Sequence, residues 1–249
     1  MAKKVAVFYG ALRTYQQTLP GIIKSFNAVV DEVIFFVWDN ELNQIASQYL
    51  LSFRKSYPQI KFEIIPLPFK DPTTRHSPAL WYNIYGFVMA IENIIKKKIF
   101  NETTVIIRIR YDLIISNSFH LPLSIGPKKT YTVNHEWLPR TKVGFDGFFI
   151  SRLYNLEILA KTFRHEIIEC NLNFNPNHIF NKVPELYFFK RVAKVNQVQP
   201  IFQKIAILRQ SGEISAPFGV KLQPMQIIRG FFYCLKYSKL RPINMKEFF

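Results

Sequence analysis

The chain has 249 residues, of which 49% are hydrophobic and 16% aromatic, including 24 Phe and 12 Tyr. This composition excludes an intrinsically disordered chain, which lacks the apolar side chains that offset ordering entropy. The formal net charge is +16, and a charge of that size attracts nucleic acid, an anionic membrane surface or phosphorylated substrates. Residues 190–249 hold 11 Lys or Arg against two Glu, so the positive charge leans towards the C-terminus.

Several other classes are not indicated. Cys170 and Cys234 have neither the spacing of a zinc site nor that of a disulfide framework. The N-terminus lacks a secretory apolar region, and the longest apolar runs are well short of the roughly 20 residues that span a bilayer. We therefore expect a cytoplasmic protein, with peripheral membrane contact as a further candidate.

The first part of the chain alternates between strand and helix patterns. Continuous apolar runs predict strands, and apolar residues at helical spacing predict the helices between them. Strands are expected at 3–8, 31–38 and 60–65, the last closed by Pro66 and Pro68, and helices at 18–29 and 42–57. This alternation is typical of parallel crossovers in a doubly wound α/β sheet.

The pattern continues with a helix at 80–97 and a β-branched strand at 104–109. That strand brings Arg110 and Asp112 to its carboxyl end, where open α/β sheets bind their ligands. Charged residues at this edge are therefore the first candidates for a site.

The turn after the first strand holds Tyr9, Gly10 and Arg13. Glycine permits close backbone approach, and an arginine at a helix start can fork onto a diphosphate. The alternative is a tight turn with a solvated arginine.

Arg108, Arg110 and Asp112 alternate along the fourth strand, which predicts that they share one side of it. The carboxylate can bind a divalent cation, and the arginines can contact phosphate oxygens. The alternative is an internal salt bridge on an edge strand.

Two further carboxylates are candidates for catalysis. Asp146 lies between glycines and aromatic residues, and Glu185 follows Pro184 at the expected start of a helix running to Val195. Either can act as a general base, while a turn-forming Asp-Gly and a favourable helix-dipole interaction are the structural alternatives. No phosphate loop, G-x-G-x-x-G fingerprint, nucleophile elbow or metal-ligand spacing of histidines occurs.

Taken in chain order, these elements resemble bacterial and viral polysaccharide-synthesis glycosyltransferases with a GT-A-like fold, including the WavE-like lipopolysaccharide and capsule proteins. The resemblance covers roughly residues 4–195 and rests on five short motifs. They are Tyr9 to Arg13, Phe36 to Asp39, Arg108 to Asp112, Phe145 to Phe149, and Pro184-Glu185.

The resemblance implies an α/β, Rossmann-type, mostly parallel sheet flanked by helices, and a hexosyl- or pentosyltransferase that uses a UDP-, GDP- or dTDP-sugar and a glycan or lipid-linked glycan acceptor. Asp112 stands where the metal-binding carboxylate of a DxD motif occurs, which implies Mn²⁺ or Mg²⁺, but Arg110 replaces the first Asp. The implied roles are nucleotide-sugar binding for Tyr9, Gly10, Arg13, Trp38, Arg108 and Arg110, metal binding for Asp112, and catalysis for Asp146 with Glu185 as the second candidate.

We expect one domain over residues 1–249, comprising a nucleotide-sugar half (1–115), an acceptor half (116–195) and a basic C-terminal segment (196–249). Apolar and basic residues between Ile227 and Arg241 form either a membrane-surface segment or a helix packed on the sheet. The rival functions are a nucleic-acid-binding protein, which has no recognised module here, and a non-catalytic glycan-binding member of the same fold.

Overall fold

The structure is a computed structural model. It describes residues 2–70, 78–97, 100–115, 119, 121–122, 125–134, 144–169, 184–201, 205–208, 210–211 and 214–218. Cys170, Cys234 and the segment from Ile227 to Arg241 lie outside these residues.

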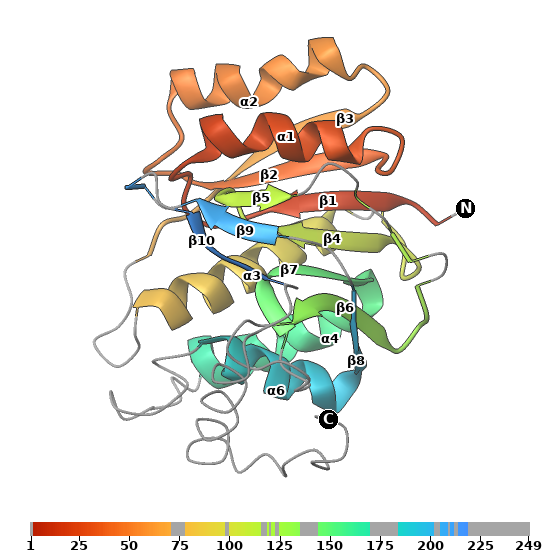
Figure 1. The fold of residues 1–249 in the computed structure, drawn as a ribbon. Coiled ribbons are helices and arrows are strands. Elements are labelled where there is room, and N and C mark those ends of the chain that lie inside the picture. Colours follow the sequence, from red (N-terminus) through yellow and green to blue (C-terminus); the bar gives the residue numbers. More distant parts are fainter. Residues whose placement is uncertain are drawn as a thin grey trace.

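A seven-stranded sheet in the order β3-β2-β1-β4-β7-β6-β8 forms the centre of the fold (Figure 1). The first four strands in that order are mutually parallel, β7 is antiparallel to both of its neighbours, and β8 is parallel to β6. The strands are β1 Lys4–Phe8, β2 Glu32–Trp38, β3 Lys61–Leu67, β4 Val105–Ile109, β6 Lys129–Asn134, β7 Gly144–Arg152 and β8 Gln197–Pro200.

Helices cover both faces of this sheet (Figure 1). One apolar core joins α1 and α2 to the face with Phe8 and Phe35, and another joins α3, α4 and α6 to the face with Val7 and Phe36. The helices are α1 Tyr15–Phe26, α2 Gln44–Ser56, α3 Pro78–Lys96, α4 Leu153–Phe163 and α6 Pro184–Val195, with the π-helix η1 Arg164–Glu169 after α4. The expected α/β class with a mostly parallel sheet flanked by helices is confirmed.

A second, antiparallel sheet has the order β10-β9-β5. Its strands are β5 Leu113–Ile115, β9 Ile205–Leu208 and β10 Ile214–Phe218. Because β5 follows Asp112 directly, this small sheet holds the chain just beyond the carboxyl end of β4. The amide of Leu208 in β9 donates to the carbonyl of Asp112 over 2.8 Å.

Most expected boundaries shift by one to three residues in the structure, and two of these shifts are informative. Strand β3 continues through Pro66 to Leu67, and this is tolerated because β3 is an edge strand, where a missing amide leaves no ladder bond broken. Helix α1 begins at Tyr15 rather than at residue 18. Its N-cap residue Thr14 makes no side-chain cap, and its hydroxyl donates instead to the carbonyl of Leu208 over 3.3 Å.

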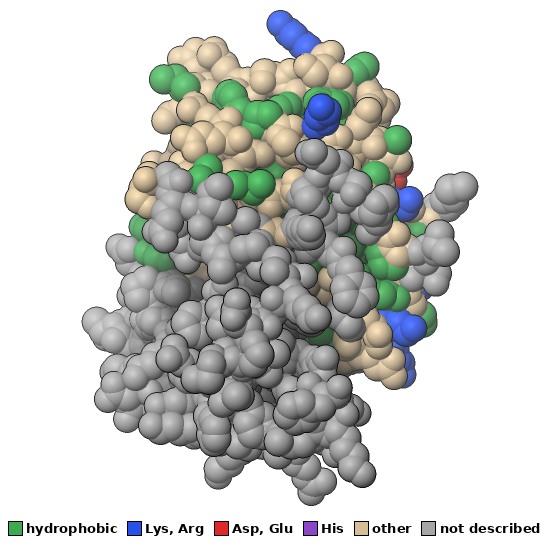
Figure 2. Space-filling model, viewed as in Figure 1, with side chains coloured by type: hydrophobic (Ala, Val, Ile, Leu, Met, Phe, Trp, Pro, Cys, Tyr) green, Lys and Arg blue, Asp and Glu red, His purple; other side chains and the backbone are tan. Residues whose placement is uncertain are grey.

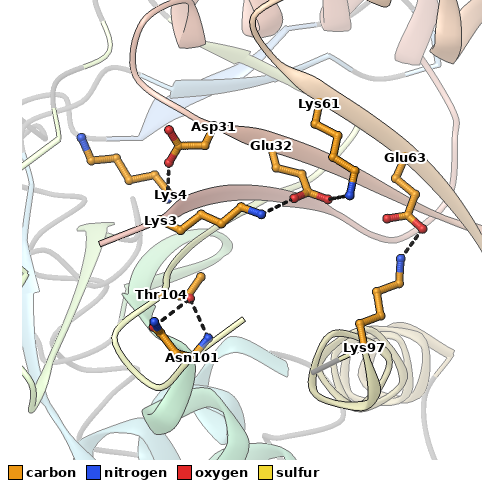
Figure 3. A network of polar contacts seen from close by, with 9 residues as sticks. All are labelled: Lys3, Lys4, Asp31, Glu32, Lys61, Glu63, Lys97, Asn101 and Thr104. Carbon is orange, nitrogen blue, oxygen red and sulfur yellow. Dashed lines mark hydrogen bonds and ion pairs between the residues drawn. The ribbon is translucent and has the colours of Figure 1, made fainter. Parts of the chain in front are cut away.

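The amino ends of the parallel strands hold a polar network of their own (Figure 3). Glu32, at the start of β2, is fully buried, and its two oxygens lie 2.7 Å from the nitrogen of Lys3 and 3.1 Å from that of Lys61. Neither contact has hydrogen-bond geometry, so the interaction is Coulombic. The network ties the starts of β1, β2 and β3 together.

Among the described residues, no helix combines the length and apolar character that crossing a membrane requires. On the described part of the face in Figure 2, Lys and Arg side chains stand apart from one another rather than gathering in one patch.

Candidate functional site

The candidate site lies where the carboxyl ends of β1 and β4 meet. The two strands are parallel neighbours, with Phe8 beside Ile109 at their last residues. The chain passes from β1 through α1 to β2 on one side, while β4 occupies the other side of β1. Such a reversal of strand order opens a crevice for ligands beyond the strand ends.

Arg110 and Asp112 form a two-pronged ion pair directly after β4. Arg110 donates from Nε to Oδ1 over 2.9 Å and from a terminal nitrogen to Oδ2 over 2.6 Å. This parallel fork is the strongest geometry between a guanidinium group and a carboxylate. Asp112 is only 2% exposed, whereas the side chain of Arg110 is 25% exposed.

Arg13 reaches the same carboxylate from the turn after β1. Its terminal nitrogen lies 3.6 Å from Oδ2 of Asp112. Gly10 begins this turn with a φ of +116°, a backbone conformation that residues other than glycine rarely adopt. A Cβ at that position would meet no atom within 4 Å. The structure therefore brings Arg13 together with Arg110 and Asp112, although about a hundred residues separate Arg13 from the other two in sequence.

Glu41 supports the turn from the segment after β2, a role that the sequence analysis missed. Its Oε2 accepts a hydrogen bond of 2.9 Å from the amide of Leu12. Burial raises the pKa of Glu41, and the bond from Leu12 and the charge of Arg13 oppose this rise. No local motif marks a carboxylate that acts on a turn so far away in the sequence.

Arg108 lies in β4, beside Val7 and Tyr9 of the core under α3, and no described contact joins it to Asp112. Its guanidinium carbon lies 3.6 Å from the centroid of the Tyr9 ring, and a terminal nitrogen donates to the carbonyl of Gly147 over 3.4 Å. The side chain is 3% exposed, and its Nε has no hydrogen-bond partner. No described carboxylate forms an ion pair with it. A buried cation without a counter-ion is costly unless an anion from outside compensates it.

Gly147 connects the two arginines to the Asp146 segment. Its carbonyl accepts both from Arg108 and, over 3.0 Å, from the amide of Arg110. Asp146 is the preceding residue of β7, so its backbone lies beside the arginines. Glu185 lies in the first turn of α6, as expected. The side chains of Asp146 and Glu185 lie outside the described part of the structure.

Trp38 ends β2 at the same edge but is 4% exposed. Its ring stacks on Tyr85 of α3 with centroids 6.0 Å apart, and a Cβ on Gly86 would lie 3.2 Å from it. The described ring contacts of Trp38 are thus packing contacts with α3 and with Phe69. Its predicted part in nucleotide-sugar binding stays a prediction.

The donor set around Asp112 does not fit a divalent cation. Such an ion prefers several oxygen ligands, and both oxygens of Asp112 already accept from Arg110. No group of three His, Cys, Asp or Glu side chains suited to a metal occurs among the described residues. Mn²⁺ or Mg²⁺ at Asp112 therefore stays a prediction, and no step below is routed through a metal.

Comparison with known proteins identifies the fold. No family model and no curated protein matches the sequence. The apo form of the glycosyltransferase GlyE of Streptococcus pneumoniae TIGR4 is similar, with a TM-score of 0.50 and 11% identity over 80% of this chain and 45% of that one. The present chain thus spans less than half the length of GlyE.

Two further solved structures match with lower scores. The mannosyltransferase PcManGT of Pyrobaculum calidifontis, in complex with GDP-Man and Mn²⁺, has a TM-score of 0.42 and 8% identity over 80% of this chain and 54% of that one. The galactosyltransferase LgtC, with donor and acceptor sugar analogues, has a TM-score of 0.43 and 9% identity over 79% and 72%. The likeness to GlyE confirms the expected GT-A fold class, while membership of the WavE-like group stays a prediction.

Proposed function

We propose that the chain is a glycosyltransferase that moves a hexosyl or pentosyl group from a nucleotide-diphosphate sugar to a glycan or lipid-linked glycan acceptor. One observation carries the proposal. Arg13 and Arg110 converge on Asp112 at the carboxyl edge of β1 and β4, near the buried Arg108, which forms no ion pair with a described carboxylate. The GT-A fold supports it, because the switch point of such a sheet is where ligands bind.

The excess of arginine at this edge suits a diphosphate. Among the described side chains, Arg13, Arg108 and Arg110 bring three positive charges against the carboxylates of Asp112 and Glu41. Planar guanidinium groups match the geometry of phosphate oxygens, and Gly10 leaves the space above its backbone open. UDP-, GDP- and dTDP-sugars share this diphosphate, so the cluster itself does not select among the three nucleotides.

The chemistry of transfer assigns a role to each group. The acceptor hydroxyl oxygen attacks the anomeric carbon, the bond from that carbon to the diphosphate oxygen breaks, and the hydroxyl proton passes to a carboxylate. The departing diphosphate gains negative charge, which the arginines stabilise in place without reorganisation. We propose Asp146 as the base, since its backbone adjoins Gly147 and the arginines, with Glu185 as the second candidate.

Donor binding is tested by the melting temperature of the full chain. UDP-, GDP- and dTDP-sugars are added in turn, because a ligand that binds only the folded state raises the melting temperature. We expect one nucleotide class to give a shift, and Arg13→Ala with Arg110→Ala to abolish it. Arg54→Ala is the matched control, since Arg54 bonds the carbonyl of Phe62 away from this edge. The absence of any shift would reject the proposed function.

Turnover is tested by release of the nucleoside diphosphate. Asp146→Ala should lower the rate by about 10²- to 10⁴-fold while donor affinity survives. If Glu185→Gln is the inactive variant instead, the two carboxylates exchange roles. A donor-induced shift without release or transfer would identify the non-catalytic alternative. Salt-sensitive binding of DNA or RNA without any donor-induced shift would identify the nucleic-acid rival.

An anionic membrane surface is a further proposed partner, because the acceptor of such a transferase can be lipid-linked. Co-sedimentation with anionic vesicles tests it, and binding must weaken as salt rises.

A further inference from the structure

We infer that this chain binds the donor diphosphate through its arginines without a divalent cation, and that Asp112 positions Arg110 and Arg13 rather than binding a metal. The inference rests on the proposed function, because it concerns the same diphosphate.

The oxygens of Asp112 are already engaged. Both accept hydrogen bonds from Arg110, at 2.9 and 2.6 Å, and Oδ2 also faces Arg13 at 3.6 Å. With the side chain 2% exposed, a metal ion must displace Arg110 to reach it. Within the described ranges, no trio of metal-binding side chains replaces the missing ligands.

The neighbouring charges oppose a cation at this point. An ion bound to Asp112 would lie beside two guanidinium groups, and like charges at such short range repel strongly in a partly buried site. The same two groups attract an anion. The carboxylate thus orients the arginines, and its two oxygens engage two of the five N–H donors of Arg110.

The cluster already supplies positive charge of the kind that a metal would bring. Among the described side chains, Arg13, Arg108 and Arg110 bring three positive charges against the carboxylates of Asp112 and Glu41, so positive charge is in excess before any metal binds. A diphosphate diester carries one negative charge on each phosphate at neutral pH, so this excess of guanidinium groups attracts it without a metal. Glu41, the other described carboxylate that acts on Arg13, is engaged by the amide of Leu12.

The test compares nucleotide affinity with and without metal. UDP, GDP and dTDP are titrated into the full chain by calorimetry, first with EDTA and then with excess Mn²⁺ or Mg²⁺. The inference predicts that the dissociation constant of the bound nucleotide changes by less than about threefold between these conditions. A gain of about tenfold or more with metal would overturn the inference and leave the proposed function standing. No binding in either condition would overturn the proposed function and the inference together.

The variant Asp112→Asn separates positioning from metal binding. If the carboxylate orients the arginines, affinity for whichever of UDP, GDP and dTDP binds the wild type falls by about tenfold equally with EDTA and with Mn²⁺, because the charged fork is lost in both. If it binds metal, the loss occurs only with Mn²⁺, which contradicts the inference. The matching nucleoside (uridine, guanosine or thymidine), which lacks phosphates, provides the control. Its affinity should stay within about twofold of wild type, whereas a general disruption of the site would weaken the nucleoside and its diphosphate alike.

Discussion

Arg108 stacks its guanidinium group on the ring of Tyr9, 3.6 Å from the centroid. The two residues come from neighbouring strands, since Val7 pairs with Arg108 and Tyr9 follows at the end of β1. A cation over an aromatic face is attracted by the electron density of the ring, but this attraction does not replace a counter-ion. The pair therefore holds a buried positive charge in place at the edge where the donor is proposed to bind.

This arrangement predicts opposite effects of one substitution on stability and on binding. Arg108→Met keeps most of the side-chain volume and removes a buried charge, so the free energy of unfolding should stay unchanged or rise by up to about 2 kcal/mol. The donor-induced rise in melting temperature should disappear. Arg54→Met, whose arginine bonds only a backbone carbonyl in the contacts described, should retain it. A variant at Arg108 that is clearly destabilised yet binds donor normally would show that the arginine is structural.

The backbone conformation of Gly10 predicts the effect of a second substitution on folding stability. Because its φ is +116° and a Cβ meets no neighbour, Gly10→Ala introduces backbone strain without a steric clash. We expect a loss of about 1–2 kcal/mol in unfolding free energy, measured by urea denaturation with an unchanged m-value. Gly21→Ala is the matched control. Gly21 lies inside α1 with equally open space around a Cβ, so alanine should stabilise by up to about 1 kcal/mol. Equal effects at the two glycines would contradict the strain argument.

The sequence predicted the layers of this fold well because they depend on local patterns. Buried parallel strands are continuously apolar, and the helices between them repeat their apolar residues at helical spacing. Pro184 and Glu185 likewise mark the start of α6, where it begins in the structure. Each of these signals lies within the segment whose structure it predicts.

The site was only partly predictable because its contacts join distant segments. Strand alternation predicted that Arg108 shares a side with Arg110 and Asp112, but β4 ends at Ile109 and the alternation ends with it. The chain then turns, which lets Arg110 pair with Asp112 while Arg108 contacts Tyr9. Glu41 and Gly147 enter the site through tertiary packing, which no spacing in a single sequence records.

The amino ends of the parallel strands, at the other end of the sheet from the candidate site, provide a prediction that concerns stability alone. Glu32 is buried between Lys3 and Lys61, which keep 37% and 58% of their side chains exposed (Figure 3). Glu32→Gln should lower the unfolding free energy by about 1–2 kcal/mol, less than for a fully buried pair, because the lysines can return to water. Donor affinity should not change, since these residues lie at the amino ends of the strands.

A surface ion pair is the control for that measurement. Glu157→Gln breaks an exposed pair with Lys161 one turn along α4 and should leave the unfolding free energy almost unchanged, because water screens the pair. If both substitutions cost the same, burial of Glu32 adds nothing to its interaction with the lysines.

The environment of Tyr187 in α6 predicts that folding stability depends on pH. Its hydroxyl donates to Oε2 of Glu166 over 2.5 Å, and Arg191 donates to the same oxygen over 2.7 Å. Burial, and then the hydrogen bond and charge of Glu166, raise the pKa of the Tyr187 phenol well above its usual value, against the opposing charge of Arg191. In the unfolded chain the phenol titrates near pH 10, so below that pH both states hold the proton.

Above about pH 10 the unfolded chain releases this proton while the folded chain keeps it, and the contribution of Tyr187 to stability therefore declines as the pH rises. Tyr187→Phe should cost about 1–2 kcal/mol at neutral pH, where it removes a hydrogen bond to a charged acceptor. The difference between wild type and variant should then shrink from about pH 10 upward, as measured by urea denaturation at a series of pH values.

Tyr154→Phe is the control. At this residue, which is 47% exposed, the substitution should change the unfolding free energy by less than about 0.5 kcal/mol at neutral pH. A difference for Tyr187→Phe that stays constant up to about pH 11 would show that folding does not raise the proton affinity of this phenol.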